Sequence, residues 1–186
     1  MSNNLKRAYT MKKLFILIAF PLLFQSCTFI NSDFKIIELA QKIQEKYNVS
    51  NNKYVTIINY GKSILSNRLY LVDMEKNEII LRTTVSHAWN SGIVYPTKFS
   101  NGKGSNKSSI GAFKTMDSYY GKYGYAMRII GLDGELNNNV MDRFVVFHSN
   151  KKMKYLWSDG CFATPEEINK KIIDKIKGGT LVYVFR

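Results

Sequence analysis

The sequence predicts a mainly β protein of the α+β class, with one helix ahead of the strands and a second near the end of the chain. Aromatic residues are abundant, with 12 Tyr and 11 Phe among 186 residues, and such residues are enriched in strands. From residue 54 onward, short apolar runs are separated by turn residues, which is the pattern of successive strands. Apolar residues recur at helical spacing in residues 33–47 and again after residue 164.

Composition and charge limit the classes of partner. Apolar residues make up 45% of a chain that is long enough for one domain with a core, so we expect a globular protein. The net charge of +13 indicates an anionic partner, such as nucleic acid, anionic lipid or an acidic cell-wall polymer. The sequence has no zinc-ligand spacing, no RNP-like aromatic motif and no basic recognition helix, so we expect no nucleic acid partner.

The first 26 residues have the pattern of a secretory signal. They hold four basic residues and no acidic one, and they include an apolar run at 14–24. This run is shorter than the ~20 residues that span a bilayer, and a basic start with a short apolar core is typical of a signal peptide. Ser26-Cys27 resembles a bacterial lipobox, which predicts a lipidated Cys27 as the mature N-terminus. Simple cleavage and an uncleaved anchor are the alternatives. We therefore expect a cell-envelope protein, periplasmic or anchored to the outer membrane as a lipoprotein.

After this signal peptide, a linker and helix are expected at 27–53, and one β-rich domain at 54–186. Asp33 can cap the helix, and polar residues from 48 end it. The buried face of this helix is formed by four residues at helical spacing: Ile36, Ala40, Ile43 and Tyr47.

The strands of the domain follow from apolar runs bounded by turn residues. A turn at 75–77 joins two of them into a hairpin. The polar, glycine-rich stretch at 96–109 predicts a long loop, which in a compact domain is usually functional or mobile. The expected strands are 54–59, 68–73, 78–86, 108–115, 126–130, 143–148 and 180–185.

The second helix has a strong start signal. Thr164 is expected at the N-cap, Pro165 at the first helical position and Glu167 at the third, which together form a capping box. Gly178-Gly179 stops the helix. Its buried stripe is expected to be Ile168, Ile172, Ile173 and Ile176.

Cys161 and His148 are the candidate reactive pair. The thiolate is the nucleophilic form of cysteine, and an imidazole with a pKa near neutrality can take the thiol proton. His148 ends an apolar run that fixes its ring, and Gly160 allows a tight turn that exposes the sulfur and aims backbone N–H groups at an oxyanion. The plainer alternative is a buried free cysteine and a strand histidine that serves the fold. A disulfide between Cys161 and Cys27 is not expected, because Cys27 lies where the signal ends.

The ordered series of these segments resembles the murein L,D-transpeptidase catalytic-domain family (YkuD-like), in particular its variant branch. The resemblance covers about Tyr54 to Phe185 and implies an L,D-transpeptidase-like β-sandwich or mixed sheets, with a helix after the catalytic cysteine. It rests on Arg68-Leu69-Tyr70-Leu71-Val72-Asp73, Ser86-His87-Ala88-Trp89-Asn90-Ser91-Gly92, Phe99-Ser100-Asn101, Ser108-Ser109-Ile110-Gly111-Ala112-Phe113, Tyr119-Tyr120-Gly121-Lys122-Tyr123-Gly124-Tyr125, Val146-Phe147-His148, Gly160-Cys161 and Ile176-Lys177-Gly178-Gly179-Thr180.

The resemblance implies a site and a reaction. Cys161 matches the nucleophile, His148 the base, Gly160 the glycine before the nucleophile, and Ser149 the residue whose carbonyl orients the base. The implied enzyme forms a thioester on Cys161 with a peptidoglycan tetrapeptide stem, releases D-Ala and makes a 3→3 cross-link. Its partners are peptidoglycan stem peptides, with a possible lipid anchor to the membrane, and no metal or organic cofactor is needed.

Several positions depart from the family pattern. Asp159 stands where the family has His or Trp, Trp157 where the branch usually has Arg, and Phe162 where it has Pro. An acidic group two residues from the thiol disfavours the thiolate, although Asp159 could instead pair with a lysine or orient His148.

Four residues are candidates for substrate contact: Asp159, Trp157, His87 and Tyr125. For His87, a structural role is the favoured alternative. For the whole chain, the alternatives are an L,D-carboxypeptidase, a catalytically degenerate peptidoglycan-binding lipoprotein and a generic secreted cysteine hydrolase.

Overall fold

The computed structural model describes residues 32–151 and 156–186. The chain divides into two compact units, Met1–Ile36 and Ile37–Arg186, and the second unit contains every element from the first strand onward. The expected signal peptide at 1–26 and the expected lipidation at Cys27 lie outside the described residues, so both stay predictions, as does the domain boundary at 53/54. Among the described residues, no helix is long and apolar enough to cross a membrane.

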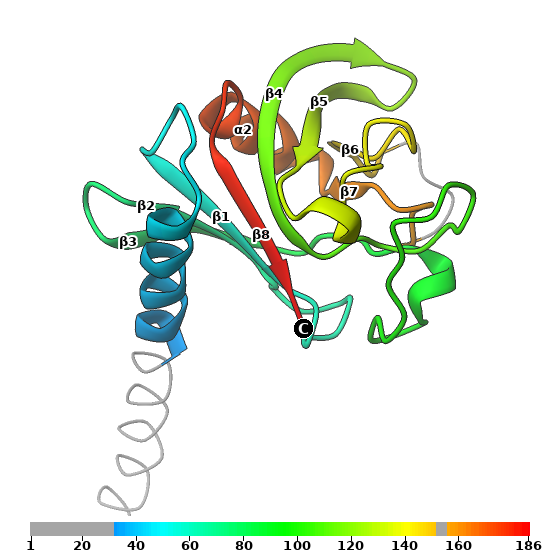
Figure 1. Cartoon of the computed structure of the whole chain (residues 1–186), viewed down its shortest axis with the longest axis horizontal. Helices are drawn as coiled ribbons and strands as arrows, with labels where there is room; N and C mark the ends of the chain where they lie inside the picture. The colour runs from blue at the N-terminus through cyan, green and yellow to red at the C-terminus, as the bar shows by residue number, and fades with distance from the viewer. Residues whose placement is uncertain (1–31, 152–155) are drawn as a thin grey trace, which may run out of the picture. The chain divides into compact units, whose positions relative to one another are not determined.

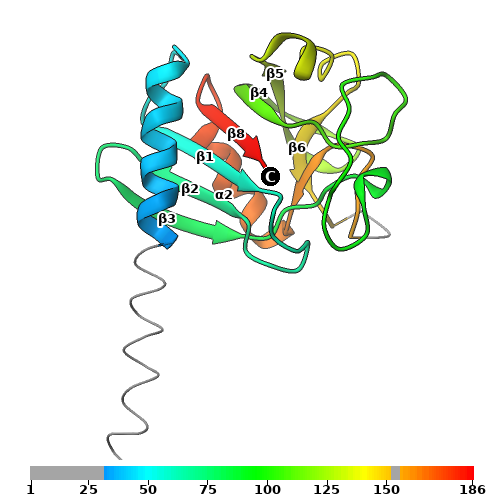
Figure 2. The same cartoon turned by 60° about the horizontal axis from the view of Figure 1, so that its bottom comes forward.

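The second unit is built on one eight-stranded mixed sheet (Figures 1 and 2). The strand order is β3-β2-β1-β8-β4-β5-β6-β7. The pairs β1–β8 and β6–β7 are parallel, and the others are antiparallel. The strands are β1 (Tyr54–Asn59), β2 (Leu69–Asp73), β3 (Glu78–Thr83), β4 (Gly111–Gly121), β5 (Gly124–Gly131), β6 (Val146–Ser149), β7 (Phe162–Thr164) and β8 (Leu181–Phe185).

Helical elements are few. The first helix covers residues 32–46 of the described chain, which confirms the helix expected at 33–47. The second is α2 (Glu166–Ile176), and two single 3-10 turns, η1 (Trp89–Ser91) and η2 (Gly134–Leu136), lie in the loops. The mainly β, α+β class expected from the sequence is therefore confirmed.

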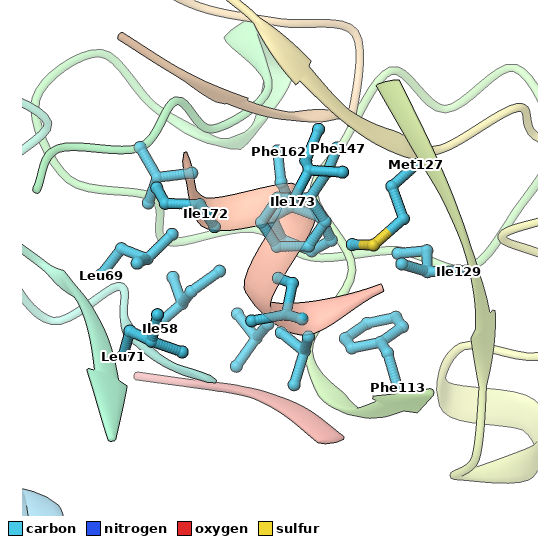
Figure 3. Close-up of a cluster of buried hydrophobic side chains, with 14 of the residues drawn as sticks. Ile58, Leu69, Leu71, Phe113, Met127, Ile129, Phe147, Phe162, Ile172 and Ile173 are labelled. Carbon is cyan, nitrogen blue, oxygen red and sulfur yellow. The ribbon is translucent and has the colours of Figure 1, made fainter. Parts of the chain in front are cut away.

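A continuous core joins α2 to the sheet (Figure 3). Ile172 and Ile173 of α2 are fully buried, and they belong to the same cluster as apolar residues of β1, β2, β4, β5, β6 and β7. Successive side chains of a strand point to opposite faces. Because Phe147 points into the core, its neighbours Val146 and His148 point to the other face of β6. The core members labelled in Figure 3 are Ile58, Leu69, Leu71, Phe113, Met127, Ile129, Phe147, Phe162, Ile172 and Ile173.

The start of α2 differs from the expected capping box. Pro165 is the N-cap residue, and no side chain caps the helix. Thr164 instead ends β7, where its carbonyl accepts a hydrogen bond from the Asn150 N–H at 2.8 Å. Its buried hydroxyl donates to Oδ1 of Asn169 at 3.0 Å. The ladder between β6 and β7 thus fixes Thr164 in a strand, which a local capping motif does not reveal.

Several strand predictions also need correction, beginning near the candidate site. The strand expected at 143–148 begins only at Val146, because Phe144 has a φ of +56° that a strand cannot accommodate. β7, with three residues, was not expected at all. The strand expected at 78–86 ends at Thr83, and the strand expected at 108–115 becomes the longer β4.

The role of Thr164 gives a stability prediction. Thr164→Val keeps the shape of the side chain but leaves the buried Asn169 Oδ1 without its donor, so we expect unfolding to become easier by about 1–3 kcal/mol. Thr164→Asp would be harmless at a solvated N-cap, but at this fully buried position it should destabilise more than the valine. Urea denaturation of the two variants measures both effects, and a neutral Thr164→Asp would contradict the assignment.

Candidate active site

The segment 86–89 runs alongside the turn that carries Cys161. The Ser86 N–H donates to the Ala163 carbonyl at 2.9 Å, and the Ser158 N–H donates to the His87 carbonyl at 2.9 Å. The Trp89 N–H donates to the Ser158 carbonyl at 3.0 Å. Ala88 and Ser158 form an isolated parallel bridge, and together with the Ser86 bond these contacts fix the backbone on both sides of the thiol.

Two serine hydroxyls hold the carbonyl of Cys161. Ser158 Oγ donates to it at 2.7 Å, and Ser86 Oγ donates at 3.1 Å. Each hydroxyl also accepts a backbone N–H, from Gly160 at 3.2 Å and from Ala163 at 3.0 Å. The sequence analysis did not single out Ser86 or Ser158. The hydroxyl of Ser86 contacts a segment 75 residues away, which leaves no local pattern, whereas the hydroxyl contacts of Ser158 lie within its own turn.

Gly160 has a backbone that favours glycine. Its φ is +132°, a conformation that residues with a side chain rarely adopt. A Cβ at this position would also lie only 3.4 Å from Nη2 of Arg143 and from the Lys107 carbonyl oxygen. The turn at Gly160 therefore packs closely against Arg143 and Lys107, and its positive φ favours glycine.

The sulfur of Cys161 lies against the backbone that leads into β6. Sγ donates to the Phe144 carbonyl at 3.5 Å, and the side chain is partly exposed. Burial raises the pKa of the thiol, and Asp159 adds to that rise. The backbone N–H of Val146 and the guanidinium of Arg143 act in the opposite direction. The resting thiol is therefore protonated at neutral pH and needs a base.

His148 is held as a neutral imidazole. Its Nδ1 bonds to the Ser149 carbonyl at 2.8 Å, and since a carbonyl only accepts, Nδ1 carries the proton and Nε2 keeps a lone pair. The ring stacks on Tyr123, with centroids 4.6 Å apart and planes at 20°. Burial lowers the pKa of His148 below its ordinary value, so the ring is unprotonated and able to accept a proton at neutral pH.

The register of β6 and β7 relates the thiol to this ring. Phe147 pairs with Phe162, and both point into the core. Cys161 precedes Phe162 and His148 follows Phe147, so alternation turns both away from the core. The thiol and the imidazole thus belong to one face at the same end of the sheet, as diagonal neighbours across the strand pair.

His87 is a structural histidine. It is fully buried, its Nδ1 accepts a hydrogen bond from Nη2 of Arg68 at 2.9 Å, and its Nε2–H donates to the Gly92 carbonyl at 2.7 Å. Burial lowers its pKa to about 4. Both ring nitrogens bond within the protein and the side chain is fully buried, which favours the structural alternative over the expected substrate contact.

Arg68 anchors this buried network. Its guanidinium donates to the Val85 carbonyl at 2.9 and 2.6 Å and to the Lys62 carbonyl at 3.2 Å. It also lies 4.8 Å from the ring centre of Tyr60, whose hydroxyl donates to the Ser86 carbonyl at 3.0 Å. These contacts of Arg68 and Tyr60 fix the backbone at the start of the 86–89 segment.

Tyr125 lies on the wrong face for the expected substrate contact. It has the same orientation in β5 as the core residue Met127, and it packs against the core cluster. Its hydroxyl hydrogen-bonds to Asp174 of α2 at 2.7 Å. Tyr125 thus supports α2, while Cys161 and His148 point to the other face. The alternation of the strand, which the sequence analysis did not apply to this residue, explains the correction.

Trp157 and Asp159 flank the thiol turn as expected from their position in the chain. Trp157 donates its Nε1–H to the Ile93 carbonyl at 2.7 Å, and its ring meets Trp89 edge-on with centroids 4.6 Å apart. Asp159 is exposed. Trp89 is 53% exposed, so an aromatic surface borders the turn and is open to a ligand.

Arg143 is a residue of the site that the sequence analysis did not single out. It donates to the Ser100 carbonyl at 2.7 Å, to Ser109 Oγ at 2.6 Å and to the Lys107 carbonyl at 2.5 Å. Arg143 therefore holds the loop expected at 96–109 against the turn at Gly160. Its partners are neutral, so its charge remains available to stabilise a thiolate on Cys161.

Known proteins provide an independent comparison. The chain matches one family model, described as the L,D-transpeptidase catalytic domain, over residues 30–185. No curated protein matches the chain.

The chain is also similar to solved structures at low sequence identity. The chain is similar to a mutant form of the helical cell shape determining protein Pgp2 from Campylobacter jejuni, with 12% identity and a TM-score of 0.52 over 74% of this chain and 48% of that one. It is also similar to L,D-transpeptidases from Enterococcus faecium (17% identity, TM-score 0.45, 72% and 50% covered) and Mycobacterium smegmatis (12%, 0.43, 72% and 59%). The chain spans about half to three-fifths of the length of these proteins. Since the family model covers most of the sequence, this chain belongs to the L,D-transpeptidase catalytic domain family.

Proposed function

We propose that the protein is an L,D-transpeptidase of the cell wall that acts on peptidoglycan tetrapeptide stems through a thioester on Cys161. Membership of the family supports the reaction class. The observation that carries the proposal is the state of His148, a neutral imidazole whose proton sits on Nδ1 against the Ser149 carbonyl. Among the described residues, Nε2 has no hydrogen-bond partner, and the register of β6 and β7 supports a place for it on the same sheet face as the partly exposed thiol, as a general base for this nucleophile would need.

In the first half-reaction, the thiol leaves its hydrogen bond with the Phe144 carbonyl and gives its proton to Nε2 of His148. The thiolate attacks the carbonyl carbon between the L-centre of the stem's third residue and D-Ala. The Gly160 N–H already donates to Ser158 Oγ, so we assign the oxyanion contact to the N–H of Cys161. The C–N bond then breaks, the D-Ala amine takes the proton from His148, and the stem remains as a thioester.

The second half-reaction decides the product. A side-chain amine of another stem attacks the thioester, passes a proton to His148 and forms a 3→3 cross-link, while the proton returns to the sulfur. If water attacks instead, the same site acts as an L,D-carboxypeptidase. We favour transfer to an amine, in line with the family, and we place the protein in the cell envelope, where the expected signal and lipidation at Cys27 would deliver it.

One observation favours a second candidate, a wall-binding module without catalysis. Asp159 is exposed two residues from the sulfur and raises the pKa of Cys161, which works against a nucleophile. Retention of the protein on purified sacculi, with unchanged stem-peptide masses and no thiol labelling of Cys161, would favour this candidate over the enzyme.

Removal of the nucleophile tests the reaction. Cys161→Ala should lower D-Ala release from a tetrapeptide muropeptide by at least about 10³-fold, and the acyl-enzyme mass should disappear. Ser149→Ala is the matched control, since the backbone carbonyl of Ser149 and not its hydroxyl contacts His148, and its turnover should stay within a few-fold of the parent. Equal turnover in Cys161→Ala would refute the mechanism.

The pH dependence of turnover follows from the base. The pKa of His148 is lowered by burial, and the ring must be neutral to accept the thiol proton. Activity should therefore persist as pH falls through the ordinary histidine value of about 6.5 and be lost only below it. The pH profile of kcat/KM for D-Ala release measures this limb, and a half-loss at or above pH 6.5 would contradict the assignment.

Two charges should move the reactivity of the thiol in opposite directions. Asp159→Asn removes a charge that raises the pKa of Cys161, and Arg143→Met removes one that lowers it. At pH 7.5 we expect alkylation by iodoacetamide to become up to about fivefold faster in the first variant and slower in the second. The rate of labelling, followed by mass spectrometry across pH 6–10, reports both shifts. Changes of the same sign would show that these charges do not act on the sulfur.

A further inference from the structure

Arg128 stands on the face of the sheet that carries the reactive groups. In the β5–β6 register, it lies directly opposite Val146. The backbone N–H of Val146 is bonded to the sulfur of Cys161, and His148 follows two residues later along β6. Residues opposite each other in a strand pair share a face, so Arg128 extends the surface of the thiol and the imidazole toward β4.

The guanidinium of Arg128 is held by an aromatic ring. Its central carbon lies 4.3 Å from the ring centre of Tyr119 in β4, a distance at which a cation–π contact restrains the side chain. Tyr119 pairs with Ala126 in the β4–β5 ladder, so its ring rises from the same face. The arginine is therefore positioned before any ligand arrives, although it is exposed.

No acid of the described chain neutralises this arginine. Within residues 32–151 and 156–186, the guanidinium of Arg128 makes no hydrogen bond and no ion pair. Asp117 lies in the bulge of β4, close in sequence to Tyr119, but no ion pair joins it to Arg128. By contrast, Arg68 and Arg143 each donate at least three hydrogen bonds to the protein itself. As far as the described residues show, the donors of Arg128 thus remain available to a ligand.

We propose that Arg128, restrained by Tyr119, binds a carboxylate of the stem peptide. This inference rests on the proposed function and adds to it a substrate contact. A planar guanidinium donates two parallel hydrogen bonds to a carboxylate, and such charge-assisted pairs give orientation as well as affinity. Arg128 would orient the stem across β5 and β6, so that the scissile carbonyl meets the sulfur at the end of β7.

A stem presents two carboxylates, which lie at different distances from the scissile carbonyl. Neighbouring strands are about 4.8 Å apart, which places the backbone of Arg128 on the order of 10 Å from the sulfur, and the side chain leans toward Tyr119, away from β6. The terminal D-Ala carboxylate lies one residue from the scissile carbonyl, at most about 3.8 Å away. The α-carboxylate of a γ-linked glutamate lies farther along the stem. Both share the chemistry that Arg128 recognises.

Equilibrium binding to a Cys161→Ala background tests the contact without turnover. The probe is a synthetic tetrapeptide, L-Ala-γ-D-Glu-L-Lys-D-Ala, titrated by calorimetry into the full chain. Adding Arg128→Met should weaken binding about 10- to 100-fold, Arg128→Lys should recover only part of it, and Tyr119→Leu should give an intermediate loss. Lys171→Met is the charge control, because it removes one exposed cation from α2, on the other face of the sheet, and it should change nothing.

Two modified probes identify the carboxylate. One of the two amidations, that of the glutamate α-carboxylate or that of the D-Ala carboxylate, should weaken binding to the Cys161→Ala chain. The variant that also carries Arg128→Met should be insensitive to that same amidation. In the enzyme with Cys161 intact, Arg128→Met should raise KM with little change in kcat.

Three results would overturn the inference. The first is equal binding of the free tetrapeptide by Arg128→Met and its parent. The second is sensitivity of Arg128→Met to both amidations. The third is a loss in Lys171→Met as large as that in Arg128→Met, which would show a general charge effect. If the Cys161→Ala chain bound no tetrapeptide and the intact chain turned none over, the proposed function would fail together with this contact. Iodoacetamide labelling of Cys161 at the parental rate in Arg128→Met would show that the thiol itself is unaffected.

Discussion

The backbone hydrogen bonds between residues 86–89 and 158–163 are the constraint on which the site depends. They are the means by which the thiol turn is attached to the sheet, since β7 has only three residues. The attachment is rigid because Arg68 is buried beneath it with no carboxylate among its contacts, and it satisfies its donors with carbonyls and with His87. Breaking the hydrogen bonds of a buried cation costs free energy. The 86–89 segment is therefore held in one position.

In the resting site, groups that raise the pKa of the Cys161 thiol oppose groups that lower it, and the thiol stays protonated. Burial and Asp159 favour the protonated sulfur, while Arg143 and the Val146 N–H favour the thiolate. The base is likewise kept neutral by burial. A neutral thiol and a neutral imidazole need no counterions in a partly closed site, and the ion pair forms only when a proton moves between them. This arrangement protects the cysteine from oxidation and alkylation, which both require the thiolate.

Much of this architecture could be predicted from local patterns. The first helix, the strand β1 and the mainly β class follow from periodicity, and the chemistry of residue types selects Cys161 and His148 as a pair that stays a prediction. Other expectations fail because contacts between distant segments override local signals. Thr164 has the sequence of a cap but is fixed by a ladder with β6. Ser86 and Ser158 become important only because they meet at the Cys161 carbonyl. Tyr125 was misplaced because strand alternation decides its face.

Phe144 has an unusual backbone conformation that the site requires. A phenylalanine in the left-handed region carries strain of order 1–3 kcal/mol, and here it turns the Phe144 carbonyl toward the sulfur while 83% of the residue remains exposed. Glycine or asparagine would adopt this backbone conformation with less strain. The phenylalanine therefore lowers the durability of the fold, and its exposed side chain adds apolar surface to the segment that leads into β6.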